Sequence, residues 1–130
     1  MIDLAGAHPV AFVLTADRDR AKPFYAGALG LAILAEDDFA VTFAVGDGAM
    51  MRLTALPGHC PGDHAVLGWS VGDIELAVAA LKARGVTFRH YDGFEQDADG
   101  IWTASDGGPR VAWFTDPDGN VLSLAQLGRQ

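Results

Sequence analysis

The sequence predicts an α+β fold in which two tandem βαβββ units form a curved mixed sheet around a cavity. Each half of the chain opens with a β-prone apolar run and continues through an aspartate into a helical pattern that ends at a glycine. Each half then closes with a hairpin that has an Asp-Gly turn. The matched landmarks are Asp17 and Asp73, Gly30 and Gly85, and the turns Asp47-Gly48 and Asp118-Gly119. Because they recur in the same order, the halves are predicted to be copies of one unit.

The first unit is predicted to begin with a strand, a capping residue and a helix. Residues 10–15 are apolar and β-prone, and Asp17 stands where an N-cap is expected before a helix over residues 20–28. Apolar residues recur in that helix at steps of three and four, which is the spacing of one helix face. Gly30 then ends the helix before the apolar residues 31–34.

A hairpin completes the first unit. Residues 39–45 and 49–56 are predicted strands, and the turn Gly46-Asp47-Gly48 joins them. Counting outward from this turn places Thr42 opposite Arg52 on one face of the sheet.

The second unit repeats this order. Residues 66–71 are a predicted strand, Asp73 is the expected cap, and residues 74–84 form a helix with a periodic apolar face. Gly85 ends that helix, and a further strand is predicted over residues 86–90.

The closing hairpin has the strongest turn signal. It joins predicted strands over residues 110–115 and 121–127 through Pro117-Asp118-Gly119, where proline suits the first central position of a type I turn and glycine the left-handed position that follows. Counting outward places Trp113 opposite Ser123 on one sheet face.

Composition limits the class of protein. The chain has 130 residues, 50% of them hydrophobic and 20% charged, so one domain is expected over residues 1–130, with units at about 8–57 and 64–128. A net charge of −8 without a basic cluster argues against nucleic acid. The single cysteine, Cys60, favours a cytoplasmic location, and no apolar run reaches the length of about 18 residues that a membrane helix needs.

Two features of the sequence resemble the vicinal oxygen chelate superfamily. They are the pair Phe24-Tyr25 and the closing stretch Val-Ala-Trp-Phe-Thr-Asp-Pro-Asp-Gly-Asn-Val-Leu-Ser-Leu at residues 111–124, set within the duplicated units. That superfamily contains glyoxalase I, the extradiol dioxygenases, and the bleomycin and fosfomycin resistance proteins. The resemblance implies a glyoxalase-like fold and a small-molecule ligand, and members of this length usually form homodimers.

The resemblance also locates the four places where the superfamily's enzymes hold a divalent metal. In this sequence they fall on Val10, Val66, Arg52 and Ser123. Two valines, an arginine and a serine are not the imidazole or carboxylate ligands that such an ion requires. We therefore expect no metal and no cofactor.

The leading hypothesis is a metal-free small-molecule-binding protein of this superfamily; sequestration of a toxic or antibiotic-like compound is a role that such binding would allow. The resemblance implies that Trp113 takes the place of a ligand-contacting aromatic residue in fosfomycin-resistance relatives. A buried Arg52 would need either an internal carboxylate or an acidic or strongly polar group on the ligand. The expected ligand is therefore mainly apolar and aromatic, and it bears one carboxylate, phenolate or carbonyl group. The predicted lining residues are Val10, Phe12, Thr42, Arg52, Val66, Gly68, Trp113 and Ser123.

The alternative hypothesis is a glyoxalase-like lyase or related enzyme with an atypical active site, so the sequence leaves open whether the protein is an enzyme. Its candidate residues are His8, His64 and Asp63. Each histidine lies two residues before a place that the metal ligands have vacated, and strand alternation would turn both toward the cavity. Cys60, next to His59, is a weaker candidate for a nucleophile.

Two further features are ambiguous in the sequence. Residues 95–100, with Asp106, copy part of a calcium-binding loop, but the expected neighbours are strands rather than helices, so a solvated acidic loop is the preferred interpretation. Trp102 could cover the cavity or contact a second subunit, whereas Trp69 is expected to pack beneath the helix over residues 74–84.

Overall fold

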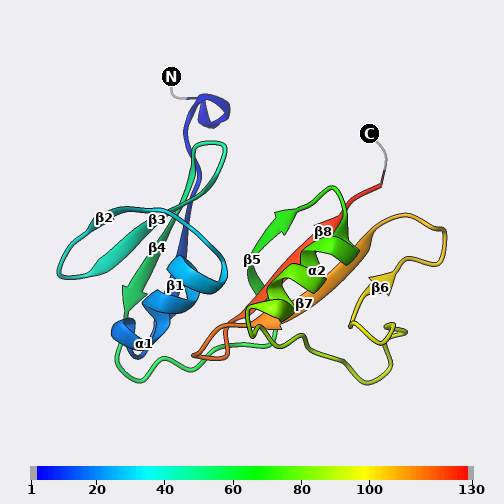
Figure 1. The fold of residues 1–130 in the computed structure, drawn as a ribbon. Coiled ribbons are helices and arrows are strands. Elements are labelled where there is room, and N and C mark those ends of the chain that lie inside the picture. Colours follow the sequence, from blue (N-terminus) through cyan, green and yellow to red (C-terminus); the bar gives the residue numbers. More distant parts are fainter. Residues whose placement is uncertain (1–2, 129–130) are drawn as a thin grey trace. The chain divides into compact units, whose positions relative to one another are not determined.

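The computed structural model describes residues 3–128, which divide after Cys60 into two compact units. Each unit contains one four-stranded sheet and one main helix (Figure 1). The α+β class and the tandem βαβββ-like units are therefore confirmed. None of the helices within residues 3–128 is long and apolar enough to cross a membrane.

The first unit follows the predicted order, after a short 3-10 turn, η1 (Leu4–Gly6). Its strand β1 pairs in parallel with β4, and β4, β3 and β2 pair antiparallel, which gives the sheet order β1-β4-β3-β2. The elements of this unit are β1 (Val10–Thr15), α1 (Arg18–Pro23), η2 (Phe24–Ala28), β2 (Ile33–Glu36), β3 (Ala40–Gly46) and β4 (Ala49–Ala55).

The second unit repeats this topology strand for strand. Its sheet has the order β5-β8-β7-β6, again with the first strand parallel to the last and the remaining pairs antiparallel. The elements of this unit are β5 (Ala65–Ser70), α2 (Ile74–Ala83), β6 (Trp102–Thr103), β7 (Arg110–Thr115) and β8 (Val121–Gln126). The shared order supports the predicted duplication.

The predicted caps are present in both units. The Asp17 carboxylate accepts a hydrogen bond from the backbone N–H of Arg20 at 3.2 Å, and Asp73 accepts one from Leu76 at 3.1 Å. Each cap satisfies a backbone donor that would otherwise lack a partner at a helix start. Gly85, directly after the second helix's C-cap, has a φ of 89°, a left-handed conformation that glycine adopts without strain.

Each sheet buries one face under its helix, as Figure 1 shows for α2 along β7 and β8. This packing removes large apolar side chains from water and is the main stabilisation of each unit. In the first unit the buried side chains include Val13, Tyr25, Phe43, Met51 and Leu53. In the second they include Ile74, Val78, Phe114, Leu122 and Leu124. Trp69 pairs with Leu124 and so lies on the helix-covered face, as expected.

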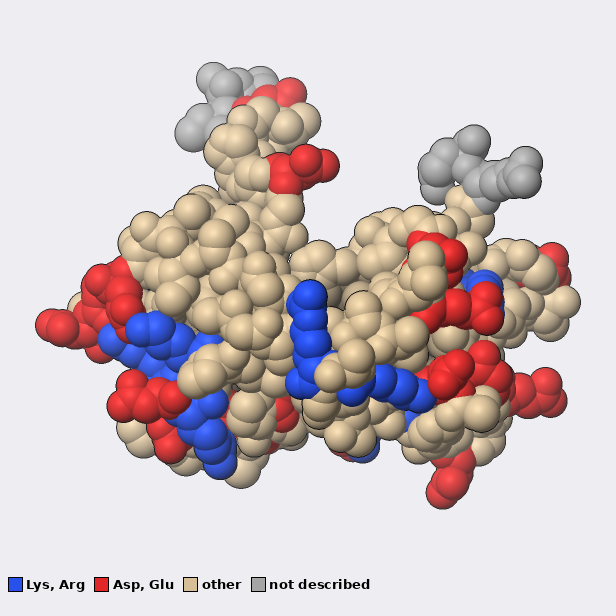
Figure 2. All heavy atoms as spheres, in the orientation of Figure 1, with Lys and Arg blue, Asp and Glu red and all other residues tan. Residues whose placement is uncertain are grey.

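Both units contain ion pairs between basic and acidic side chains. Lys22 binds Glu36 at 2.8 Å in the first unit, and Lys82 binds Asp99 at 2.9 Å in the second. Figure 2 shows basic atoms bordered by acidic ones on the face that it draws.

Two predicted elements differ in the structure. The first helix begins at Arg18 rather than at residue 20, and after Pro23 it widens into the π-helical turn η2. Proline has no N–H for the usual helical bond, which explains why the regular helix stops there. The expected strand over residues 86–90 is reduced to one β-bridge between Phe88 and Phe114, and the two-residue strand β6, which the sequence did not indicate, extends the sheet beside β7.

Candidate ligand pocket

The strand registers gather six of the predicted residues into two rows, one on each sheet. In the first unit Phe12, Arg52 and Thr42 lie side by side across β1, β4 and β3. In the second unit Gly68, Ser123 and Trp113 lie side by side across β5, β8 and β7. Both predicted cross-strand pairs, Thr42 with Arg52 and Trp113 with Ser123, are confirmed.

Arg52 is held by other residues of the first unit. Its Nη1 donates to Oγ1 of Thr42 at 3.1 Å, and its Nη2 donates to Oδ2 of Asp37 at 3.2 Å. The sequence left open whether this charge meets a carboxylate of the chain or a group of the ligand. Asp37 supplies the carboxylate, from the turn that follows β2. Arg52 therefore does not require an acidic ligand.

Asp37 is itself fixed by the turn that it occupies. Backbone N–H groups of Phe39 and Ala40 donate to its Oδ1 at 2.8 and 2.9 Å. These two hydrogen bonds, followed by the contact with Arg52, hold the pKa of Asp37 below its ordinary value because they favour the charged carboxylate.

Gly68 creates space in the row of the second unit. A Cβ atom at this position would overlap the Ser123 hydroxyl oxygen and would lie 3.1 Å from the Ser123 carbonyl oxygen. A side chain at residue 68 would therefore displace Ser123, the neighbour of Trp113. The glycine therefore leaves room on the sheet face for the Ser123 side chain.

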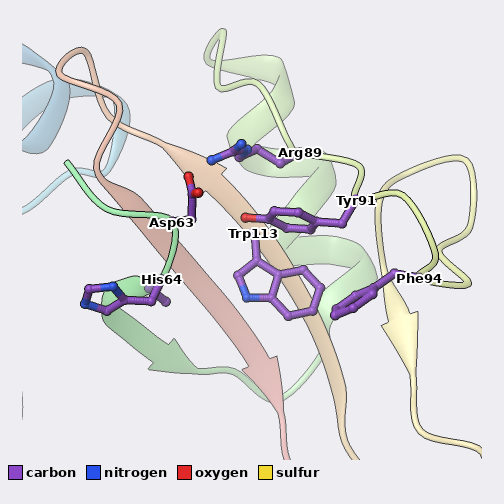
Figure 3. Close-up of a pocket in the computed structure, with 7 residues that line it drawn as sticks. Asp63, His64, Arg89, Tyr91, Phe94 and Trp113 are labelled. Carbon is purple, nitrogen blue, oxygen red and sulfur yellow. The ribbon is translucent and has the colours of Figure 1, made fainter. Parts of the chain in front are cut away.

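A cavity of about 540 Å³ lies beside Trp113 in the second unit (Figure 3). This volume is within the range of about 300–1,000 Å³ that is typical of small-molecule sites. It is lined by Asp63, His64, Ala65, Arg89, Tyr91, Phe94 and Trp113. Of the eight lining residues that the sequence predicts, Trp113 alone is among the described residues of this wall.

Three aromatic rings form the apolar wall of the pocket. The Trp113 ring lies 5.5 Å from that of Tyr91, nearly perpendicular to it, and 5.7 Å from that of Phe94. Tyr91 and Phe94 are 5.8 Å apart, so each ring contacts the other two. Trp102 of β6 extends the cluster, with its ring 6.5 Å from that of Phe94. Such a wall suits a flat apolar ligand.

The polar groups of the pocket come from two segments. Asp63 and His64 lie on the segment before β5, and Arg89 lies on the segment that follows α2. The Arg89 guanidinium carbon is 5.0 Å from the centre of the Tyr91 ring, a cation–π arrangement. Within residues 3–128, the guanidinium has no hydrogen bond or ion pair.

Gln96 fastens the loop that carries Arg89, Tyr91 and Phe94. Its Oε1 accepts from the Tyr91 backbone N–H at 2.7 Å, and its Nε2 donates to the carbonyl oxygens of Arg89 at 2.9 Å and Gly100 at 2.7 Å. Gln96 is not part of the pocket wall. It therefore positions the wall from outside.

The sequence did not indicate Arg89, Tyr91 and Phe94 as site residues. The one sign of an aromatic wall in the sequence is the number of aromatic residues from Phe88 to Trp102. Their spacing follows neither a helical nor a strand period, so it does not predict that their rings meet. The structure does bring Asp63 and His64 to Trp113, although the sequence assigned the first two to a different hypothesis. His8 lines a separate hollow of about 340 Å³ in the first unit.

The four places of the superfamily's metal ligands carry the wrong chemistry for a divalent ion. The side chains of Val10 and Val66 have no atom that can bind a metal, Ser123 offers a hydroxyl, and the cation of Arg52 is bound to Asp37. Elsewhere among residues 3–128, no three His, Cys, Asp or Glu side chains lie close enough together to hold a metal ion. The residues present at these places do not fit the metal.

Residues 7–124 match the family model of the Glyoxalase/Bleomycin resistance protein/Dioxygenase superfamily. No curated protein sequence matches the chain.

Solved structures share the fold over nearly the whole chain. TnmS3, an antibiotic binding protein from Streptomyces sp. CB03234, is 26% identical, with a TM-score of 0.67, 95% of this chain covered and 97% of that one. A member of the superfamily from Sphaerobacter thermophilus DSM 20745 is 26% identical, with a TM-score of 0.70 and coverages of 93% and 97%. Lactoylglutathione lyase from Agrobacterium tumefaciens is 18% identical, with a TM-score of 0.70 and 93% of each chain covered, a likeness of fold alone.

Proposed function

The chain belongs to the Glyoxalase/Bleomycin resistance protein/Dioxygenase superfamily, and we propose that it is a metal-free member that binds small aromatic molecules. The observation that carries this proposal is the pocket in the second unit, with Trp113, Tyr91 and Phe94 as its apolar wall. Binding in this pocket needs no reactive group and no metal.

The rings of the wall favour a flat, apolar ligand. Phe94 is 51% exposed, so it offers uncovered aromatic surface to a ligand. Burial of apolar surface drives association, and an aromatic pair adds roughly 0.5–1.5 kcal/mol beyond that burial. The wall is therefore better suited to an aromatic ring system than to a small hydrophilic metabolite.

Sequestration of a toxic or antibiotic-like compound is the biological role that fits such a binding protein. The resemblance to TnmS3, an antibiotic binding protein with 26% identity over 95% of this chain, supports this role. Sequestration requires affinity for the compound without turnover, which agrees with the non-ligand residues at the four metal places.

A lyase-like enzyme is the second candidate, and one observation favours it. Asp63 and His64 both line the aromatic pocket, and carboxylate and imidazole side chains are the usual general acids and bases of enzymes. A lactoylglutathione lyase from Agrobacterium tumefaciens shares the fold of this chain. This candidate requires multiple turnovers of a small-molecule substrate, with a rate that falls in a His64→Gln variant.

Titration with a neutral flat probe, 2-acetylnaphthalene, tests the binding proposal. Calorimetry should show saturable binding to the native protein and a large loss of affinity in Trp113→Ala, because that change removes the ring that contacts both other aromatic residues. Trp69→Phe is the matched control, since Trp69 lies on the opposite sheet face. Equal affinities of the native protein and Trp113→Ala would contradict the pocket assignment.

We also propose a homodimer in the cytoplasm. The edge strands are β1 and β2 in the first sheet and β5 and β6 in the second. Such edges are commonly covered by a symmetric partner. The single cysteine suits a reducing compartment. Light scattering at micromolar concentration should give twice the mass of one chain, and the mass of a single chain would refute the dimer.

A further inference from the structure

We propose that the pocket of the second unit selects aromatic ligands that carry one acidic group, and that Arg89 binds this group. The inference rests on the proposed function of the same pocket, and it names the class of ligand and the residue that recognises it. The recognition of a polar ligand group, which the sequence suggested for Arg52, is thereby assigned to Arg89.

The two arginines differ in their partners. Arg52 already donates to the Asp37 carboxylate and the Thr42 hydroxyl. The Arg89 guanidinium, which lines the pocket, has neither a hydrogen bond nor an ion pair with any of residues 3–128. A guanidinium stays charged and has five N–H donors in a planar fork that matches a carboxylate. Arg89 is therefore the available cation.

The backbone holds Arg89 beside the aromatic wall. Its N–H donates to the Trp113 carbonyl oxygen at 2.8 Å, and its own carbonyl oxygen accepts from Gln96 at 2.9 Å. The guanidinium also rests over the Tyr91 ring. A ring system placed on Trp113 would consequently present a substituent to a cation that its contact with Tyr91 already places beside the wall.

The same contact disfavours a cationic ligand. An aromatic cage for an ammonium group needs open ring faces, but one face of Tyr91 is occupied by Arg89. A second cation at this ring would lie close to the guanidinium and be repelled by it. The aromatic wall is thus arranged for apolar contact and for an acid beside it.

Asp63 opposes an acidic ligand, but only weakly. Its side chain is exposed, and Figure 3 draws its carboxylate on the same side of the pocket as Arg89. Water and salt screen the repulsion from an exposed charge, whereas a direct charged hydrogen bond to Arg89 is screened much less. We therefore expect removal of the Asp63 charge to strengthen the binding of acids.

Three probes with one ring system separate these effects: 2-naphthoic acid, 2-acetylnaphthalene and 2-(aminomethyl)naphthalene. With the native protein, calorimetry should show that the acid binds about tenfold more tightly than the neutral ketone, because a hydrogen bond to a charged group contributes roughly that factor. The amine should bind most weakly. Asp63→Asn should raise the ratio of the affinity for the acid to the affinity for the ketone.

Two arginine variants locate the acid contact. Arg89→Gln should bring the ratio of the two affinities, acid over ketone, down to about one, and saturable binding of the ketone would show that the pocket is still formed. Arg52→Gln should keep the preference, because Arg52 is bound to Asp37. Loss of the preference in Arg52→Gln but not in Arg89→Gln would overturn the assignment of Arg89.

The remaining outcomes separate this inference from the proposed function. If the ketone and the acid bind the native protein equally, the inference is wrong and the aromatic-binding function stands. If the amine binds most tightly and Asp63→Asn weakens it, the pocket recognises cations and the inference is wrong. If none of the three probes shows saturable binding, the proposed function fails, and the inference fails with it.

Discussion

Arg52 and Asp37 form an ion pair that joins the middle of β4 to the turn after β2, with 3.2 Å between Nη2 and Oδ2. The guanidinium also holds Thr42 on β3, the strand between these two elements. The pair therefore fastens three consecutive parts of one sheet. It also uses a charge that would otherwise be available to a ligand.

Arg52→Met should cause only a modest loss of stability. The Asp37 side chain is half exposed, and ion pairs near the surface contribute little once water and salt have screened them. We expect a melting temperature lower by no more than a few degrees, with a difference from native that shrinks at high salt. Thermal unfolding at low and high ionic strength provides the measurement, and a loss that is large and independent of salt would contradict this account.

Asp37 should contribute to acid unfolding. Because its pKa in the folded protein lies below the unfolded value, its stabilisation is complete above the unfolded pKa and is lost as the pH falls through the folded pKa. Asp37→Asn should therefore flatten the decline of melting temperature as the pH falls through and below the ordinary pKa of an aspartate. Asp38→Asn, a change at the adjacent exposed residue, is the control and should keep the native decline. An unchanged slope in Asp37→Asn would exclude this role.

Gly68→Ala should destabilise the second unit by roughly 1–3 kcal/mol, the usual effect of overpacking. The new Cβ would overlap the Ser123 hydroxyl, so Ser123→Ala in the same chain should restore part of the loss. The rescue is partial because the Ser123 carbonyl oxygen stays close. Urea unfolding of the two single variants and the double variant gives the coupling. Gly72→Ala, where a Cβ would meet nothing within 4 Å, is the control.

Gln96→Ala should weaken ligand binding without removing any residue of the pocket wall. The change deletes three hydrogen bonds that fix the loop bearing Arg89 and Tyr91, so the loop must be ordered when the ligand binds. We expect lower affinity for 2-acetylnaphthalene and faster amide exchange at residues 89–101. Glu95→Ala, a change at the exposed neighbour, should alter neither. Native affinity in Gln96→Ala would show that the loop needs no such support.

The purified protein should contain no stoichiometric divalent metal. The places of the superfamily's ligands are taken by valine, serine and arginine, which do not fit such an ion. Elemental analysis should find no zinc, nickel, manganese or iron near one per chain, and a chelator should leave the melting temperature unchanged. One tightly held ion that disappears in His8→Ala or His64→Ala would promote the enzyme hypothesis.

Elements with strong local signals were predictable from the sequence. The turn Pro117-Asp118-Gly119 determines the hairpin register by its own geometry, so the pairing of Trp113 with Ser123 could be counted in advance. The caps Asp17 and Asp73 are likewise local, since each bonds to an N–H three residues ahead.

The wall of the pocket depends on contacts that local signals do not encode. Residues 86–90 have strand-like composition, but they form one bridge and then leave the sheet for a loop that Gln96 holds together. The rings of Tyr91 and Phe94 reach Trp113 through that loop, although these residues lie 22 and 19 positions before Trp113 in the sequence. The partner of Arg52 could not be predicted from local signals either, because Asp37 lies on a turn whose shape depends on the neighbouring strands.

Gln96 holds the loop in place, whereas other residues form the pocket wall, and this division has an evolutionary consequence. Gln96 bonds only to backbone atoms of the loop, so its contacts do not depend on the side chains at residues 89, 91 and 94. Mutations at those positions could change the wall while the frame of the loop is inherited intact. A lineage exposed to a new compound could therefore adapt its specificity through a few substitutions at low risk to folding.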